Sequence, residues 1–310
     1  RMDFPSFPRI TTQQRLAPRG LFSATEKVHG AHLVVDAGKT VRCGKRKAWL
    51  DDDEPFFGWQ LLRGALTEAA LAIRAALGED AFLYGELFGG AYPHPDVPPV
   101  PGLQAVQTGV WYSPQLHWAL FDVRVGDAFL SHEVVERLAL DAGVMRVPLV
   151  AKGTLAELEA LPLRAPTRIP AALGLPPLAD NFAEGLVLKP LGTRSVGDAA
   201  PLKRKIEEFS EGRFDESAAF HDPGDLDLEA LWAHAQRCLT PARAASARSK
   251  VGADASAIHE EVVFDVLLDL ALAFPHSFAR LGTAEETLKA RLKHTSPCAS
   301  GERSERTLRV

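Results

Sequence analysis

Lysine is scarce in this chain, and five of its 11 lysines fall in four short segments that carry residues suited to chemistry. A lysine amine, unlike an arginine guanidinium, can lose its proton and act as a nucleophile. Lys27 lies in the run 26–30 (EKVHG), three residues before Gly30. A K-x-x-G pattern alone is weak evidence, because about one arises by chance in a chain of this length. An exposed lysine beside a turn glycine would look the same.

Two glutamates lie at the ends of predicted strands. Glu86 is in the run 84–90 (YGELFGG), where the glycines would let a ligand approach the backbone closely. Glu184 and Lys189 mark the two ends of a short apolar strand, 185–190. The plain alternatives are a strand followed by a glycine turn and a solvated pair at strand ends.

A pair of lysines alternates along another predicted strand. Lys203 and Lys205 share one face of it, and Arg204 faces away. Two ammonium groups on one face repel each other unless an anion lies between them. The pattern therefore favours a bound phosphate chain.

These segments need a mixed framework to position them. Strands are predicted at 32–43 (a hairpin), 81–87, 117–125, 185–190 and 201–206, and helices at 63–77 and 131–142, with a further short helix at the capping box of Thr154 and Glu157. After residues 223–224 the chain predicts only helices, at 226–239, 253–274 and 283–293. We therefore expect an α+β domain over 1–222 and a small all-helical domain over 223–310, with a flexible end from about 295.

Composition limits the classes of partner and compartment. The net charge of -5 and pI of about 6.1 exclude a uniformly basic polyanion binder, so a polyanion would have to be bound locally. No apolar stretch approaches the roughly 20 residues of a membrane span, and no secretory signal is visible. The cysteines, Cys43, Cys238 and Cys298, are scattered without a CxxC pair, which favours a reducing, cytoplasmic location.

Taken in chain order, the segments resemble the motifs of the covalent nucleotidyltransferases, the superfamily of ATP-dependent polynucleotide ligases and capping enzymes. EKVHG resembles motif I, YGELFGG motif III, Phe121-Asp122 motif IIIa, EGLVLKP motif IV and LKRK motif V. The whole set, with CGKR ending at Arg46 and FFG at 56–58, is similar to the RNA ligase 2 family, which includes the RNA-editing ligases. The resemblance covers roughly residues 20–212 and implies an ATP-grasp-like ligase domain of antiparallel sheets flanked by helices.

The resemblance also implies a reaction. The amine of Lys27 would attack the α-phosphate of ATP, release pyrophosphate and carry AMP as a phosphoramidate. AMP would then move to an RNA 5′-phosphate, and a 3′-hydroxyl would displace it to seal the strand. The implied cofactors are ATP and Mg2+ or Mn2+, and the implied catalytic residues are Lys27, Arg46, Glu184, Lys203 and Lys205.

Each residue of the implied ATP site takes a role from the resemblance. Glu26 would lie at the purine edge, Phe121 would stack on adenine, and Glu86 would accept hydrogen bonds from the ribose hydroxyls. Glu184 would bind the metal through water, because magnesium keeps part of its hydration shell. The remaining members are Gly30 in the motif I turn, Lys189, Lys203 and Lys205 at the phosphates, and Arg46 at the leaving pyrophosphate or the RNA 5′-phosphate.

One position departs from the family pattern. The family usually has asparagine three residues after the histidine of the HxG run, and this chain has His32 there. The resemblance places that position near the end-joining chemistry. We therefore expect His32 to affect strand sealing more than self-adenylylation.

The helical tail favours RNA as the partner. DNA ligases and capping enzymes of the superfamily follow motif V with a β-barrel of the OB type, whereas this chain follows it with helices. Residues 230–253 hold no acid but four bases, Arg237, Arg243, Arg248 and Lys250, which either contact a phosphate backbone or are ordinary solvated residues. We expect a monomer that acts on nicked duplex RNA or on RNA ends and does not bind membranes.

Two alternatives stay open on the sequence alone. The first is the same chemistry with another acceptor, in a DNA ligase or in a capping-type enzyme that uses GTP. The second is a non-catalytic nucleic-acid-binding relative that has kept the fold. The second alternative predicts a damaged motif, yet Lys27, Glu86, Glu184, Lys203 and Lys205 are all present.

Overall fold

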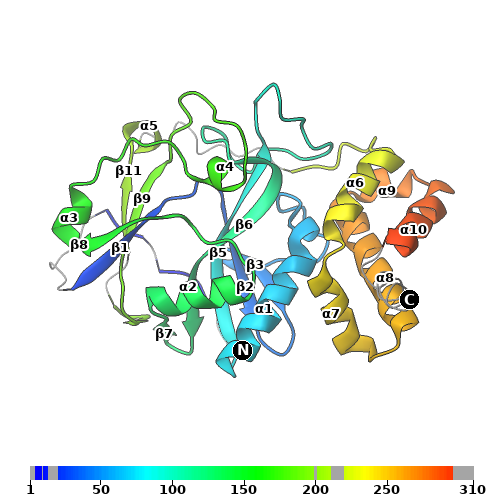
Figure 1. The fold of residues 1–310 in the computed structure, drawn as a ribbon, viewed down its shortest axis with the longest axis horizontal. Helices are drawn as coiled ribbons and strands as arrows, with labels where there is room; N and C mark the ends of the chain where they lie inside the picture. The colour runs from blue at the N-terminus through cyan, green and yellow to red at the C-terminus, as the bar shows by residue number, and fades with distance from the viewer. Residues whose placement is uncertain (1–3, 9, 13–19, 199–200, 211–219, 296–310) are drawn as a thin grey trace, which may run out of the picture. The chain divides into compact units, whose positions relative to one another are not determined.

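The computed structural model describes residues 4–8, 10–12, 20–198, 201–210 and 220–295. Helices and strands are mixed, and the named strands in these ranges pair antiparallel. The prediction of an α+β fold with antiparallel sheets is confirmed (Figure 1). Within the same ranges, no helix combines the length and apolar character needed to cross a bilayer.

The chain divides into two compact units. One unit comprises Arg1–Leu50 and Ala69–Ala218, and the other comprises Asp51–Glu68 and Ala219–Val310. This division differs from the expected domains because the segment 51–68 groups with the C-terminal helices. The roles expected for 1–222 and 223–310 stay predictions, and the end expected to be flexible, 296–310, lies outside the described residues.

The first unit holds two antiparallel sheets. The four-stranded sheet runs in the order β11 (Leu202–Lys205), β9 (Gly185–Pro190), β1 (Leu21–Glu26) and β8 (Leu149–Thr154). The seven-stranded sheet runs in the order β10 (Arg194–Ser195), β7 (Ala128–Phe129), β6 (Ser113–Val125), β5 (Ala81–Ala91), β2 (Ala31–Ala37), β3 (Arg42–Lys45) and β4 (Ala48–Trp49). Strands distant in sequence therefore become neighbours in each sheet.

Short helices flank these sheets. They are α2 (His132–Asp141), α3 (Leu155–Glu159), α4 (Ile169–Ala172) and α5 (Glu207–Ser210), and α1 (Arg63–Leu77) crosses the boundary between the units. The capping box predicted at Thr154 and Glu157 is confirmed, with both reciprocal hydrogen bonds present. A buried cluster that includes Val28, Phe88 and Ile206 packs residues that follow β1 and β11 against the seven-stranded sheet.

Strand β1 was not predicted, because its sequence LFSATE looks too polar for a buried strand. Phe22 and Ala24 face one way and pack in a cluster with Leu158 of α3. Ser23 and Thr25 face the other way and are buried too. Their hydroxyls donate to backbone oxygens of β9, each at 3.4 Å, which removes much of the cost of burying them.

The second unit is helical in its described part. It contains η1 (Trp59–Leu62), the first turns of α1, and five C-terminal helices: α6 (Leu228–Cys238), α7 (Pro241–Val251), α8 (Ala255–Ala273), α9 (Pro275–Ala279) and α10 (Ala284–Thr295). The sequence did not predict α7, because Pro241 looked like a break. Proline is instead the first residue of this helix, after the cap Thr240, where its missing N–H costs nothing.

Ion pairs engage two of the four bases between residues 230 and 253. Arg243 is 4% exposed and its Nη2 lies 2.8 Å from Asp269, which also accepts from Arg63 at 2.9 Å. Lys250 pairs with Glu261 and Asp265. Arg243 is therefore neither available to a phosphate backbone nor an ordinary solvated residue, so neither of the two alternatives holds for it.

Candidate functional site

One end of the four-stranded sheet collects three separate segments of the chain. The N–H of Lys27, the residue after β1, donates to the oxygen of Gly185 at 2.9 Å. On the other side of β9, Lys205 of β11 lies opposite the same Gly185. This register places Lys27, Glu184 and Lys205 around one point.

Glu184 is the centre of this group. Its side chain is 1% exposed, with Oε2 2.6 Å from Lys27 Nζ and Oε1 2.7 Å from Lys205 Nζ. His29 Nδ1 lies 3.3 Å from Oε2. Burial alone would raise the pKa of Glu184, but the hydrogen bond from His29 and the interactions with both lysines outweigh it and lower the pKa to about 2. Glu184 is therefore ionised across the physiological range.

Gly185 is needed for this register. Its φ is +151°, and a Cβ built there would lie 1.9 Å from the backbone oxygen of Arg204 on β11. A side chain at this position would push β9 and β11 apart. The glycine of the 184–190 run therefore serves the close pairing that brings Lys205 to Glu184.

Glu86 approaches the group from the other sheet. It lies on β5, and the N–H of Gly30 donates a hydrogen bond to it. Burial and the charge of the neighbouring Glu184 raise the pKa of Glu86 to about 7, even though the charge of Lys27 lowers it. Gly30 packs tightly here, since a Cβ would lie 2.1 Å from the oxygen of Leu87. Near neutral pH, Glu86 can either donate or accept a hydrogen bond.

His32 and Arg46 lie on the same side of the site as Glu86. His32 is opposite Glu86 in the pairing of β2 with β5. Burial and the charge of Arg46 lower the pKa of His32 to about 4, so the ring is neutral at pH 7. Arg46 is exposed between β3 and β4, and its charge also acts on Glu86.

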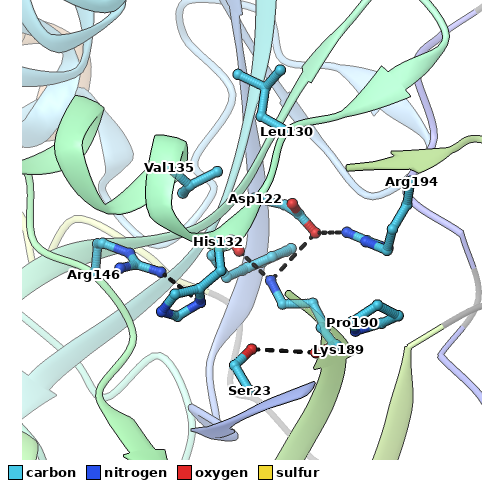
Figure 2. A pocket seen from close by; sticks show the side chains of 10 residues that line it. Ser23, Asp122, Leu130, His132, Val135, Arg146, Lys189, Pro190 and Arg194 are labelled. Carbon is cyan, nitrogen blue, oxygen red and sulfur yellow. Dashed lines mark hydrogen bonds and ion pairs between the residues drawn. The ribbon is translucent and has the colours of Figure 1, made fainter. Parts of the chain in front are cut away.

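Lys189 does not join the Lys27 group. It lies four residues along β9 from Gly185, which is about 13 Å at the rise of a strand. Its amine is 3.3 Å from Asp122 Oδ2 and donates to the oxygen of Phe121, and Arg194 binds the same Asp122 (Figure 2). Burial lowers the pKa of Lys189, and the charge of Asp122 offsets part of that effect.

Phe121 lies close to both His32 and Lys189. Its ring centroid is 5.6 Å from that of His32 and 5.1 Å from that of Phe7. The amine of Lys189 lies 5.7 Å from the ring centroid. The expected adenine contact of Phe121 stays a prediction.

Glu26 and Lys203 make hydrogen bonds that the sequence did not predict. The carboxylate of Glu26 accepts from the Thr167 hydroxyl and, at 2.9 Å, from the N–H of Arg168. The backbone N–H of Lys203 donates to the backbone oxygen of Thr11 at 2.8 Å. Glu26 is therefore oriented by a segment far away in sequence, and its expected place at a purine edge stays a prediction.

His29 was not among the predicted site residues. Its backbone N–H donates to the Tyr112 hydroxyl at 2.8 Å, and its ring is buried. An ionised carboxylate only accepts hydrogen bonds, so Nδ1 carries the proton toward Glu184. The other ring nitrogen, Nε2, has no hydrogen-bond partner among the described residues. Its spacing of two from Lys27 was the only signal in the sequence.

The side chains of this site suit a metal ion that is held through a water molecule. Among the described residues, no group of three or more His, Cys, Asp or Glu is arranged to hold a metal ion. Glu184 is ionised, but each of its oxygens already accepts from a lysine. This arrangement fits a contact through a metal-bound water and does not fit a metal held by protein ligands alone.

Comparisons with known proteins bear on the same residues. A model of the family described as RNA ligase matches residues 20–205, which include the Lys27, Glu86, Glu184 and Lys205 positions. The chain belongs to the RNA ligase family. This assignment agrees with the resemblance found in the motifs, and it covers the first unit's described sheets from β1 to β11.

Two curated relatives in this family are trypanosomal. RNA-editing ligase 2, mitochondrial, of Trypanosoma brucei brucei is 34% identical over 224 residues, which are 61% of this chain and 54% of that protein. RNA-editing ligase 1, mitochondrial, is 29% identical over 266 residues, which are 72% of this chain and 55% of that protein. The chain spans about half the length of the curated relatives it matches.

Solved structures of a Naegleria gruberi RNA ligase are also similar. A mutant with ATP and Mn gives a TM-score of 0.47 at 18% identity, over 68% of this chain and 59% of that chain. The same ligase with PPi gives a TM-score of 0.45 at 20% identity, over the same shares of the two chains.

Proposed function

We propose that this member of the RNA ligase family is an ATP-dependent RNA ligase that works through a lysyl-AMP intermediate on Lys27. The observation that carries the proposal is the contact of Lys27 with Glu184, 2.6 Å, beside Lys205. A nucleophile, an ionised acid and a phosphate-binding cation are thereby held together by strand register. The family assignment supports the same chemistry, since the named relatives are RNA-editing ligases.

In the first step Lys27 Nζ, after losing a proton, attacks the α-phosphorus of ATP. A nitrogen–phosphorus bond forms, the bond from that phosphorus to the bridging oxygen breaks, and pyrophosphate leaves with the bonding electrons. Lys205 and Lys203 supply positive charge to the α-phosphate oxygens as negative charge develops there. A Mg2+ or Mn2+ ion, when bound, supplies further positive charge to the phosphates, and Glu184 would hold it through water.

The nucleoside contacts follow from the positions of the other site residues. Glu86, with a pKa near 7, can exchange hydrogen bonds with the ribose hydroxyls, and Phe121 offers a ring to adenine. Glu26 would lie at the purine edge, Gly30 keeps the backbone close to Glu86, and Arg46 would meet pyrophosphate or an RNA 5′-phosphate. Lys189 would contact phosphates only by leaving Asp122.

The later steps concern RNA. AMP passes from Lys27 to a 5′-phosphate, and a 3′-hydroxyl then displaces AMP to form the phosphodiester. We propose nicks in duplex RNA as the substrate, in an RNA repair role. A monomeric state and a cytoplasmic location stay predictions, and both curated relatives are named as mitochondrial proteins.

The test is incubation with α-labelled ATP and Mg2+ or Mn2+. Wild type is expected to retain label, and Lys27→Ala is expected to retain none. Lys39→Ala, at an exposed lysine of the β2–β3 turn, is the matched control and is expected to label like wild type. A chase with nicked duplex RNA and nicked duplex DNA then identifies the acceptor.

The outcomes separate the alternatives. Label that moves to RNA and appears in a sealed strand supports the ligase. Label that moves only to DNA, or that forms from GTP in place of ATP, would support the same chemistry with another acceptor or nucleotide. No label from either nucleotide would contradict the proposal and favour a binding protein.

A further inference from the structure

A second group of charged side chains lines a small pocket in the first unit. Figure 2 shows Asp122, Lys189 and Arg194 on one side of it and His132 and Arg146 on the other. The open space has a volume of about 10 Å3, close to the least that holds one water molecule. A nucleobase is therefore too large for it, whereas a single oxygen of a larger group fits.

Two buried donors in this pocket have no acceptor among the residues that the structure describes. His132 is 7% exposed, and Arg146 Nη2 lies 3.4 Å from its Nδ1. Arginine can only donate, so Nδ1 is the acceptor and the ring proton is on Nε2. Within the described part of the chain, neither His132 Nε2 nor Arg146 Nε has a hydrogen-bond partner. Buried donors of this kind are rarely left unsatisfied in a native protein.

The neutral state of His132 follows from its surroundings. Burial, together with the charges of Arg146, Lys152 and Lys189, lowers its pKa to about 4, although the charge of Glu136 opposes this. At neutral pH the ring therefore presents one N–H to the pocket and carries no charge.

Positive charge exceeds negative charge around the pocket. Asp122 Oδ2 accepts from both Lys189 and Arg194, so one carboxylate serves two cations. Arg146 Nη1 is 3.4 Å from Glu136, whose side chain is 50% exposed, which weakens that pair. A ligand that accepts hydrogen bonds and carries negative charge would therefore suit the pocket.

We propose that this pocket binds a phosphate group, with one oxygen accepting from His132 Nε2–H and Arg146 Nε–H. The phosphate belongs either to a free anion, inorganic phosphate or pyrophosphate, or to a polynucleotide backbone. The site is distinct from the Lys27 group, because Lys189 and Ser23 lie four residues along β9 and β1 from Gly185 and Lys27, about 13 Å away. The proposal does not rest on the proposed ligase activity.

The first measurement uses the unmodified full chain without ATP. Histidine rings are labelled with nitrogen-15, and the His132 resonance is followed while inorganic phosphate, pyrophosphate or a short RNA with a 5′-hydroxyl is added at constant ionic strength, with chloride as the reference. A saturable shift of His132 Nε2 with phosphate or pyrophosphate is expected, and competition by the RNA would identify the backbone as a source. A shift with RNA alone would assign the site to the backbone only.

Matched variants test the two donors. His132→Phe removes the N–H and is expected to weaken phosphate binding about tenfold, the cost of one lost charge-assisted hydrogen bond. His132→Gln keeps an N–H donor near Nε2 and is expected to bind within about threefold of wild type. His117→Gln, at a half-buried histidine that does not line the pocket, is the control.

Two results would overturn the proposal. One is a His132 resonance that responds to none of the phosphate compounds or responds equally to chloride, which would leave a bridging water as the partner of both donors. The other is phosphate binding of equal strength in wild type and His132→Phe. Neither result would bear on labelling of Lys27 by ATP, so a failure here is distinguishable from a failure of the ligase proposal.

Discussion

The Glu184 carboxylate pairs with more than one positively charged group, and this affects how Lys27 can react. Its carboxylate accepts from Lys27, Lys205 and His29 at once. An ionised acid with a pKa of about 2 is a weak base, so it orients the Lys27 amine better than it removes a proton from it. His29 Nε2 is buried beside this carboxylate and has no hydrogen-bond partner among the described residues.

The raised pKa of Glu86 predicts a pH-dependent cost to stability. The folded-state pKa is about 7 against 4.5 for an unperturbed group. The folded protein therefore holds this proton more tightly than the unfolded chain, and stability falls as pH rises from about 4.5 to about 7. Glu86→Gln cannot ionise, so it should be more stable than wild type above pH 7, by about 1 to 3 kcal/mol.

Urea unfolding at about pH 8 and about pH 5 checks this prediction. The stabilisation by Glu86→Gln should be largest at the higher pH and small at the lower one. Glu79→Gln, at an exposed glutamate before β5, should show no such difference. An equal effect of Glu86→Gln at both pH values would mean that Glu86 ionises normally in the folded protein.

His32 stands where the family usually has asparagine, and its neutral state lets it act like an amide. With a pKa of about 4 the ring carries one donor and one acceptor at neutral pH. We therefore expect His32→Asn to seal nicked RNA within about threefold of wild type and His32→Ala to lose about tenfold in sealing. Both variants should form enzyme-AMP at the wild-type rate.

Single-turnover sealing of pre-adenylylated RNA, compared with labelling by ATP, separates the two steps. A loss of labelling in His32→Ala that matches the loss of sealing would place His32 in the first step. Full sealing by His32→Ala would show that the ring only packs against Phe121 and Tyr84.

At the scale of elements, the site depends on the pairing of β9 with β11. Gly185→Ala would place a Cβ 1.9 Å from the Arg204 oxygen, in a backbone conformation that L side chains rarely adopt. We expect a loss of about 3 kcal/mol or more in unfolding free energy, together with loss of enzyme-AMP, because Lys205 would move away from Glu184. Gly192→Ala meets nothing within 4 Å and is the control.

Thermal unfolding and ATP labelling of the two glycine variants are to be compared. A Gly185→Ala protein with wild-type stability and labelling would show that β9 and β11 accommodate a side chain at this position without loss of unfolding free energy. A large effect of Gly192→Ala would show that glycine replacement in this region is harmful for another reason.

Local patterns were enough to predict many elements. The bounds of α1, 63–77, and of β9, 185–190, agree with the prediction, because an Ala/Leu-rich run and a short apolar run are strong signals. β8 was missed because its residues are exposed or only partly buried and its sequence, LVAKGT, lacks a clear alternation. α7 was missed because proline marks a helix start as readily as a helix end.

The site was predictable only in part. Motif order assigned Lys27, Glu184 and Lys205, and the register of the four-stranded sheet brings them within hydrogen-bond distance. The contact of Glu26 with Thr167 spans 141 residues, and that of Lys189 with Asp122 spans 67. No local pattern encodes such pairings, since they depend on how distant segments pack.

At the scale of the whole molecule, the two compact units are interleaved in sequence. Residues 51–68 belong with 219–310, although the first unit's chain lies on either side of them. In the second unit, Trp59 is 2% exposed, Cys238 Sγ lies 3.7 Å from the oxygen of Leu61, and Arg63 pairs with Asp269. The segment 51–68 therefore obtains its burial and its ion-pair partner from the C-terminal helices.

This interleaving predicts that a chain ending at residue 222 is not simply a smaller enzyme. It keeps 51–68 but removes the helices that bury Trp59 and the carboxylate that pairs with Arg63. We expect its midpoint of thermal unfolding to fall by at least about 5 °C, since each kcal/mol lost shifts the midpoint of a domain of this size by roughly 2–4 °C.

Asp269→Asn in the full chain removes the charge alone, so its unfolding midpoint should lie between those of wild type and the shortened chain. Calorimetry of the three proteins, with ATP labelling as a second readout, checks the order. An unchanged midpoint in the shortened chain would mean that 51–68 is stable without its helical partners and that the expected division at residue 222 is the physical one.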